Sequence, residues 1–293
     1  KPNHMKHLFG CLCSFLLLHS AIWAQNKSGY NLEDARDNMD AYMKVRGSLS
    51  PTDEVVFYAK GAIYAYDPEK PWKHLFNFEM YNIARSEKLP GDSGWRLITR
   101  EMLVYQDPKT NEIIATWKNP WTGEEVEVMH VWNDPVNQQF KYGSFKVPYQ
   151  RMGSDRLGMF NDVPLSYPSP LKTSEWPDNT RSDVYQGAEL FNFFCSEKEL
   201  NNKKIVNATA DVSWTRFSDF LPWMKMSSKP GNLLYQGRGY KLKNGYADLP
   251  EKIKSFVESN FPEYAHAPAT YTSPNMTSWK YYKKVMEERK KKG

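Results

Sequence analysis

The feature that most limits the fold of this chain is a series of segments rich in β-branched and aromatic residues, separated by short links. The links consist of turn-forming residues, such as Pro90-Gly91-Asp92 and Asn119-Pro120-Trp121-Thr122-Gly123. Regular spacing with short links is typical of an antiparallel meander, because parallel βαβ units need long crossover connections. The predicted strands cover residues 54–66, 75–86, 95–105, 112–117, 125–132, 139–148, 186–195, 207–217 and 232–242.

Few segments read as helices. They cover residues 33–43, with Asn31 as the expected N-cap, 250–259 and 275–290. Four prolines within residues 159–183 predict a long irregular connection there. So many antiparallel strands in one domain either close into a barrel or pack as two sheets. We therefore predict a mainly β domain over residues 25–293, an antiparallel meander closed as a barrel or barrel-like sandwich with a few peripheral helices.

The first residues have the pattern of a targeting segment. A short basic flank at Lys6 precedes an apolar run from Leu8 to Leu18, and the small residue Ala24 follows. This order is typical of a secretory signal peptide, and the run is too short to span a bilayer comfortably. We expect residues 1–24 to be removed, which predicts an exported bacterial protein, periplasmic or secreted, with no stable membrane insertion afterwards.

Charge and cysteine content narrow the class of protein further. The chain has 39 Lys and Arg against 34 Asp and Glu, and residues 280–293 alone hold seven basic and two acidic residues, which equals the whole excess of +5. A near-neutral body argues against nucleic-acid binding. Once Cys11 and Cys13 leave with the signal, Cys195 has no disulfide partner within the chain. No CxxC or HExxH spacing occurs, so we predict neither a metal nor a cofactor; the oligomeric state stays open.

Alternation along the strands predicts an unusual interior. One face of the segment 75–85 carries Glu79, Tyr81 and Arg85, and Trp214 shares a face with Arg216. A charge beside aromatic rings on one face fits neither a pure core nor a pure surface. We interpret these faces as the lumen of a barrel that binds a polar ligand.

Several strings in the chain resemble a bacterial family known as domain of unknown function 1838. The resemblance covers roughly residues 40–270 and is carried by MKVRGS (43–48), LFNFEMYNIAR (75–85), TWKNPWTG (116–123), WTR (214–216), LPWMKM (221–226) and KPG (229–231). The family label implies no activity. Exported proteins of this sort, from bacteria that live on algal polysaccharides, also resemble the carbohydrate dehydratase of ulvan breakdown. That resemblance implies a lyase that eliminates water from a uronic acid of an acidic oligosaccharide.

Elimination of water beside a carboxylate needs a base, an acid and cations that hold the carboxylate as charge develops. His130 is the expected base, because its ordinary pKa lies nearest neutrality, and Tyr81 or Tyr58 is the expected acid. We expect the substrate to be bound by guanidinium groups, by polar side chains that fix hydroxyls and by indole rings, namely Arg85, Arg100, Arg216, Glu79, Asn82, Asn133, Trp132 and Trp214.

Two alternatives remain open at this stage. A barrel lined by aromatic and polar groups serves equally well as a non-catalytic periplasmic binding protein for a carbohydrate or an aromatic small molecule. His130 also has a structural interpretation, as a half-buried strand histidine hydrogen-bonded to the backbone.

Overall fold

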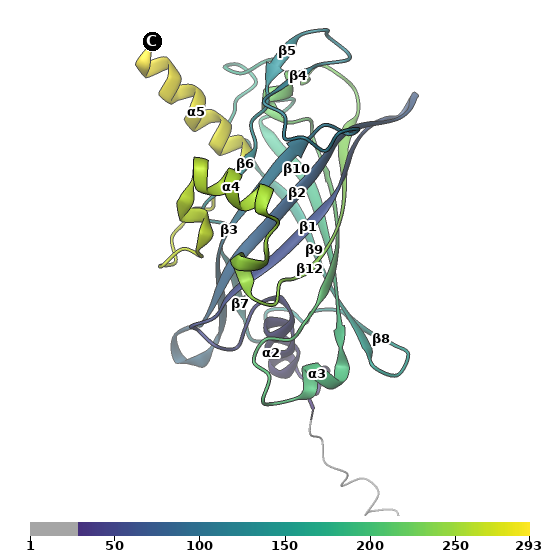
Figure 1. Cartoon of the computed structure of the whole chain (residues 1–293), viewed down its shortest axis with the longest axis vertical. Coiled ribbons are helices and arrows are strands. Elements are labelled where there is room, and N and C mark those ends of the chain that lie inside the picture. The colour runs from purple at the N-terminus through teal and green to yellow at the C-terminus, as the bar shows by residue number, and fades with distance from the viewer. Residues whose placement is uncertain (1–28) are drawn as a thin grey trace, which may run out of the picture.

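The structure, a computed structural model, describes residues 29–293. The predicted signal segment lies outside the described residues. Strands dominate (Figure 1): β1 Glu54–Asp67, β2 Lys70–Lys88, β3 Gly94–Gln106, β4 Thr116–Lys118, β5 Glu125–Glu127, β6 Val131–Asn133, β7 Gln138–Lys141, β8 Tyr149–Met152, β9 Arg156–Pro168, β10 Val184–Ser196, β11 Asp211–Ser218 and β12 Asn232–Lys241. The α-helices are α2 Ala35–Arg46, α3 Glu197–Asn201, α4 Glu251–Asn260 and α5 Ser278–Lys292.

Ten of these strands form one antiparallel sheet in the order β6-β3-β2-β1-β12-β11-β10-β9-β8, and β7 also pairs with β3. The mainly β, antiparallel prediction is therefore confirmed. Closure into a barrel is wrong: within residues 29–293 no ladder joins β8 or β9 to β3, β6 or β7. The sheet is strongly curved and open along one side (Figure 1). β4 and β5 make a separate two-stranded sheet.

The open side, which we call the seam, is bridged by residues 272–279, which we call the strap. On the β3 side, the amide of Met276 donates to the carbonyl of Pro135 at 2.8 Å, and Asn137 and Asn275 exchange two hydrogen bonds of 2.9 Å. On the β10 side, the ring of Trp279 packs 4.6 Å from that of Tyr185. The strap thus connects the β3 side of the sheet to β10 across the seam, where no strand ladder connects them.

α2 fills the lower end of the curved sheet (Figure 1). Asp34, and not Asn31 as predicted, is its N-cap, because the Asp34 carboxylate accepts the amides of Arg36 and Asp37. The helix buries Met39, Tyr42 and Met43 completely, in a cluster with strand residues from both sides of the seam such as Trp95, Phe140, Met159 and Phe193. The lower end of the interior is therefore a packed apolar core.

Two other predictions about elements need correction. The segment 159–183 is not irregular throughout, because β9 runs to Pro168 and pairs with β10 along its whole length. β8 pairs with β9 only as far as Met159, so Pro164 and Pro168 lie where β9 is an edge strand and needs no further N–H donors. The predicted strand 125–132 is split: β5 pairs with β4, whereas β6 pairs with β3.

Part of the outer face of the sheet is covered. α4 and the 3₁₀ helix η5 (Pro262–Ala265) lie over β2 and β3, where Ile253, Val257 and Tyr264 join a buried cluster with Tyr81 and Ile83. Within the described part of the chain, no helix combines the length and the apolar character that crossing a membrane requires.

Candidate functional site

The middle of the interior, between the α2 core and the upper apolar cluster, carries charged side chains. Glu189 on β10 and Arg216 on β11 lie directly opposite each other in the ladder and form an ion pair. Their side chains are only 20% and 19% exposed. The same guanidinium donates to the hydroxyl of Tyr185 at 2.8 Å. Two neighbouring strands thus place a fixed positive charge inside the sheet.

A second acidic group faces this ion pair from the other side of the interior. Glu101 on β3 accepts a hydrogen bond of 2.6 Å from the side-chain amide of Asn133 on β6. Burial, together with the negative charge of Glu189, raises the pKa of Glu101 above the ordinary value of a glutamate. Glu101 therefore holds a proton more readily than an exposed glutamate, while Glu189 is paired with a cation.

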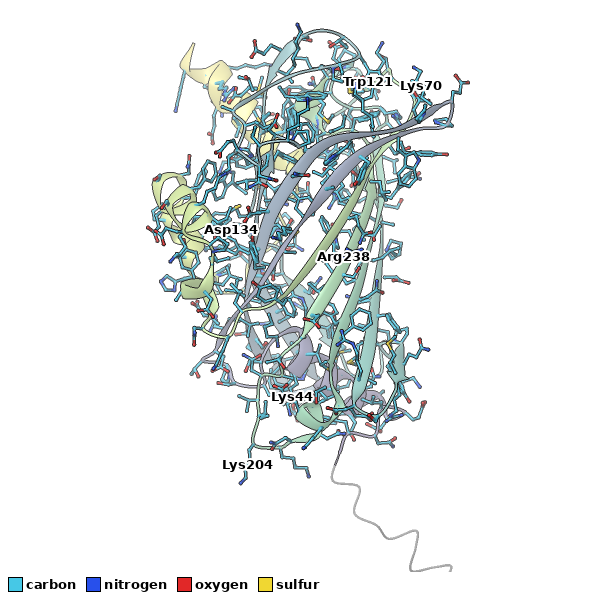
Figure 2. All side chains as sticks on the ribbon, turned by 45° about the vertical axis from the view of Figure 1, so that its right-hand side comes forward. Lys44, Lys70, Trp121, Asp134, Lys204 and Arg238 are labelled. Carbon is cyan, nitrogen blue, oxygen red and sulfur yellow. The ribbon has the colours of Figure 1, made fainter. Side chains whose placement is uncertain are left out.

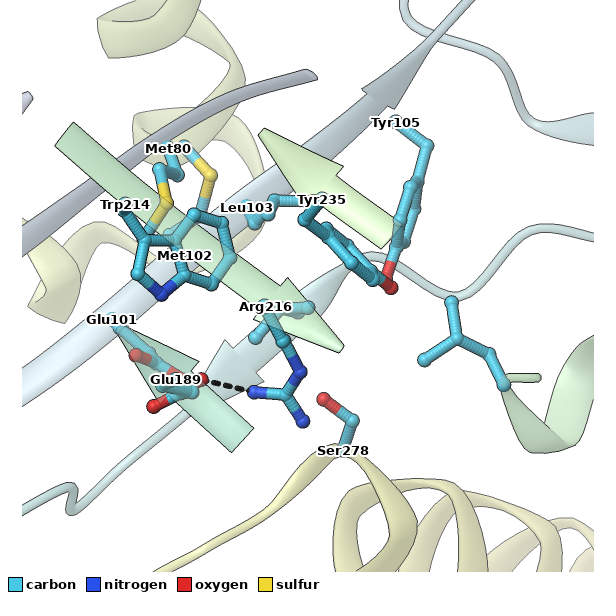
Figure 3. Close-up of a pocket in the computed structure, with 12 residues that line it drawn as sticks. Met80, Glu101, Met102, Leu103, Tyr105, Glu189, Trp214, Arg216, Tyr235 and Ser278 are labelled. Atoms are coloured by element: carbon cyan, nitrogen blue, oxygen red, sulfur yellow. Dashed lines mark hydrogen bonds and ion pairs between the residues drawn. The ribbon is translucent and has the colours of Figure 1, made fainter. Parts of the chain in front are cut away.

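A small cavity lies where these groups meet, with Glu101, Glu189, Trp214, Arg216 and Tyr235 in its wall (Figure 3). Its volume is about 30 Å³, which is room for a single water molecule. Burial raises the pKa of Tyr235 to about 12, so its hydroxyl keeps its proton at neutral pH. We call Glu101, Glu189, Arg216 and Trp214 the central cluster.

Ser278 reaches the same cavity from the strap, at the start of α5 (Figure 3). The rest of the wall is mainly apolar and includes Met80, Leu103 and Leu221. The strap therefore forms part of the cavity wall where it crosses the seam, and Glu189 and Arg216 stay partly exposed there. A ligand larger than water fits the cavity only if some of these wall residues move.

Some buried polar atoms around the central cluster have no hydrogen-bond partner among residues 29–293. They are the indole nitrogen of Trp214, Oδ1 of Asn133 and Nη1 of Arg46, whose other terminal nitrogen donates to Asn82 at 2.7 Å. Buried polar groups are normally paired, and an unpaired one costs about 1–3 kcal/mol. Of these three residues Trp214 lines the cavity, so its unpaired N–H suits a polar ligand or bound water there.

The structure brings four of the residues predicted from the sequence into or beside this interior. Arg216 and Trp214 line the cavity, Asn133 bonds to Glu101, and Asn82 bonds to Arg46. These residues come from β2, β6 and β11, so the curvature of the sheet brings together positions far apart in the sequence.

The other strand residues predicted to line the lumen lie on the outer face. Tyr58 donates to the carboxylate of Glu79, the hydroxyl of Tyr81 donates to the carbonyl of Tyr264 at 2.9 Å, and Arg85 donates to the carbonyl of Ala269. The expectation that their face lines the interior is wrong. The helical segment after β12 covers much of this outer face, so polar groups on it are buried there and resemble lumen residues in the sequence.

Arg100 and Trp132 belong to the same covered outer face. Arg100 forms an ion pair of 3.1 Å with Asp134 and lies over the ring of Tyr264. The ring of Trp132 is 4.6 Å from that of Phe261. Both side chains hold the helical cover against β3 and β6, and neither reaches the central cluster.

His130 lies between β3 and α4, apart from the central cluster. Its Nδ1 accepts the backbone amide of Tyr105 at 3.2 Å, and Phe256 packs against the ring edge to face at 5.3 Å. Burial lowers the pKa of His130 to about 4, so the ring is neutral at physiological pH. The structure does not bring His130 together with Arg216, Tyr81 or Tyr58.

Glu101, Glu189 and Arg46 were not among the predicted site residues. The sequence does contain a signal for Glu101. Arg100 and Glu101 are adjacent in one strand, so their side chains point to opposite faces of the sheet, and one of the two charges must face the interior. Arg46 lies at the end of α2, and its approach to the sheet depends on how that helix enters the interior. Within residues 29–293, no group of three His, Cys, Asp or Glu side chains is arranged to hold a metal ion.

Comparison with known proteins adds a family and a distant structural similarity. A family model described as "Protein of unknown function (DUF1838)" matches residues 52–286. No curated protein matches the chain. Among solved structures, a LolA superfamily protein from Nitrosomonas europaea is similar at 11% identity and a TM-score of 0.19, over 75% of this chain and 96% of that one.

Proposed function

The chain belongs to the DUF1838 family, and we propose that it binds an acidic, hydroxyl-bearing sugar at the central cluster and eliminates water from it. The observation that supports this proposal is the meeting of two carboxyl groups in different states with one guanidinium at a single cavity. A buried carboxyl group with a raised pKa, such as Glu101, is typical of acid–base sites. A uronate at the end of an oligosaccharide is the substrate that the resemblance to the dehydratase of ulvan breakdown implies.

The roles follow from the surroundings of each group. Glu189 accepts the proton from the carbon beside the substrate carboxylate, and Glu101 gives its proton to the departing hydroxyl, which leaves as water. Arg216 provides positive charge for the carboxylate as it takes on enolate character. Trp214 offers an apolar face for the sugar ring and an indole N–H for a hydroxyl. Together, these residues replace the His130 and tyrosine pair expected from the sequence.

The test is to incubate the protein with a disaccharide that ends in glucuronate. We expect a product lighter by one water molecule, with the ultraviolet absorption of a new carbon–carbon double bond. Glu101→Gln and Glu189→Gln should each reduce turnover by about 10²-fold or more. Asp162→Asn is the matched control, because Asp162 is exposed and lies opposite Leu190, next to Glu189 but on the outer face. Full turnover in both glutamine variants would refute these roles.

A second candidate function is binding without chemistry. It is favoured by the position of His130, whose Nδ1 accepts a backbone amide apart from the central cluster, so that the base expected from the sequence is absent there. On this alternative, calorimetry detects binding of the disaccharide while mass spectrometry detects no product. Arg216→Met should then weaken binding, and Glu101→Gln should leave it largely unchanged.

A further inference from the structure

The upper end of the molecule carries exposed aromatic side chains on a projecting hairpin. The turn between β1 and β2 extends beyond the neighbouring strand β12 (Figure 1), and Lys70 marks its tip in Figure 2. Trp72 is 58% exposed, the most of any large hydrophobic side chain in residues 29–293, and Tyr66 is 36% exposed. Their rings pack together at 6.0 Å. The hairpin thus presents a preformed aromatic cluster to its surroundings.

Basic groups lie at the same end. Lys73 lies over the ring of Trp121, in the link between β4 and β5, at 5.1 Å. α5 is fixed to β5 by two hydrogen bonds of 2.7 Å between Arg289 and Glu127. The final turn of α5 ends in three exposed lysines, residues 290–292. Both views place this turn toward the same end of the long axis as the hairpin, on the opposite side of the molecule (Figures 1 and 2).

The two features have complementary roles. The hairpin itself is electrically balanced, since Asp67 and Glu69 offset Lys70 and Lys73, so its contribution is apolar. The excess positive charge comes from α5. Tryptophan and tyrosine favour the boundary between lipid headgroups and acyl chains, and lysines with long stems reach from there to headgroup phosphates. A surface with both features fits an anionic lipid bilayer better than a soluble anion, which offers no apolar layer.

We propose that this end of the molecule binds peripherally to membranes that contain anionic lipid, with Trp72 and Tyr66 at the headgroup boundary and Lys290, Lys291 and Lys292 at the lipid phosphates. The proposal does not depend on the central cluster, which lies in the middle of the molecule and faces inward. It requires no spanning segment, because an aromatic cluster and a basic helix end act at the surface.

The test is co-sedimentation of the protein with vesicles of phosphatidylcholine alone and with about one-third phosphatidylglycerol, at low and at physiological salt. We expect binding to the anionic vesicles and little to the neutral ones. Trp72→Ala should weaken binding about tenfold, and Lys290→Gln, Lys291→Gln and Lys292→Gln together should weaken it at least as much, since each lysine near an anionic surface contributes about fivefold.

The controls use equivalent groups elsewhere. Tyr240 is 51% exposed near the end of β12 that lies away from the hairpin. Lys203 and Lys204 are exposed at the opposite end of the molecule, where Figure 2 labels Lys204. Tyr240→Ala and the pair Lys203→Gln and Lys204→Gln should bind vesicles as the parent protein does, and all variants should melt at the parent temperature. Equal weakening by these controls, equal binding to neutral vesicles, or binding only to a soluble sulfated polysaccharide would overturn the proposal.

Discussion

Two regions of the interior bury charge in opposite ways. At the α2 end, the ammonium of Lys241 donates to the carbonyls of Lys44 and Gly47 at 3.1 and 3.0 Å and to Oδ1 of Asn207 at 2.7 Å. Lys44 likewise donates to the carbonyls that end α3, of which that of Leu200 is nearest at 2.6 Å. An ammonium has three N–H donors, so each lysine is fully paired. Around the central cluster, by contrast, buried donors and acceptors remain unpaired.

The contrast separates a structural use of charge from a functional one. The two lysines complete the last turns of α2 and α3, where carbonyls lack partners within the helix and the helix dipole favours a cation. Such a site is complete without any ligand. Around the central cluster, some buried polar atoms lack a hydrogen-bond partner, and the cluster lies at a cavity. Both features are typical of a site that acts on another molecule.

The largest effect should come from removing a fully paired charge. Lys241→Met removes one of the two donors to the Lys44 carbonyl, which keeps the amide of Ala208, and removes the donor to the Gly47 carbonyl and to Asn207. We expect a loss of about 3–5 kcal/mol in the free energy of unfolding. Chemical denaturation measures this loss. Lys243→Met is the matched control, since Lys243 is exposed two residues further along. A loss below about 1 kcal/mol would remove the structural role given to Lys241.

Arg216→Met should cost somewhat less, about 2–4 kcal/mol, because Glu189 loses its countercharge but can still take up a proton. The double variant Arg216→Met with Glu189→Leu should recover most of the lost stability, because no unpaired charge then remains. No similar recovery is expected for Lys241, whose partners are backbone carbonyls. A double variant as unstable as the single one would contradict the contrast between the two regions.

His130 tests a third environment, in which one backbone amide is the only hydrogen-bond partner found for the ring among the described residues. Its folded pKa of about 4 lies below the ordinary 6.5, so the unfolded chain takes up a proton first as pH falls. Stability should therefore fall between pH 6.5 and 4, by about 3 kcal/mol from this residue alone. His130→Gln should remove that share, and an NMR titration midpoint near 6.5 would contradict the burial argument.

The smallest effect should come from Glu101→Gln. Because the folded pKa of Glu101 is raised, the native protein holds its proton while the unfolded chain releases it, and stability declines as pH rises from the ordinary glutamate value to the raised one. The glutamine variant lacks this decline. Its stability relative to the parent should therefore increase across that window. A relative stability that falls with pH would show that the native state favours the charged form of Glu101, which contradicts the raised pKa.

Most of the sheet could be predicted from the sequence, because alternation and turn residues are local signals. The strands β1, β2, β3, β10 and β12 match predicted segments to within a few residues, apart from the longer start of β2. β9 was missed because Pro164 argues against a strand, and only the order of strands shows that this part of β9 is an edge. Strand order depends on pairing between segments far apart in the chain, so it cannot be predicted from local patterns in a single sequence.

The site was predicted in part for a related reason. The sequence shows which residues share a face of a strand, as with Trp214 and Arg216, but not which face lines the interior. In β2, alternation predicts that the face with Glu79, Tyr81 and Arg85 lines the interior. In the structure, α4 and η5 cover this face from outside. A helical cover that arrives from the last part of the chain cannot be inferred from the strand that it covers.

The strap sets how wide the interior is. In a closed barrel, strand number and stagger fix the diameter, so a roomier lumen requires a new pattern of pairing. Here a segment of eight residues, 272–279, spans the gap, and it is held by a few hydrogen bonds and packed rings. Insertions or deletions in that segment can therefore enlarge or shrink the hollow while every β-ladder keeps its alignment. A change in the length of this one loop can thus fit the interior of a homologous chain to ligands of a different size.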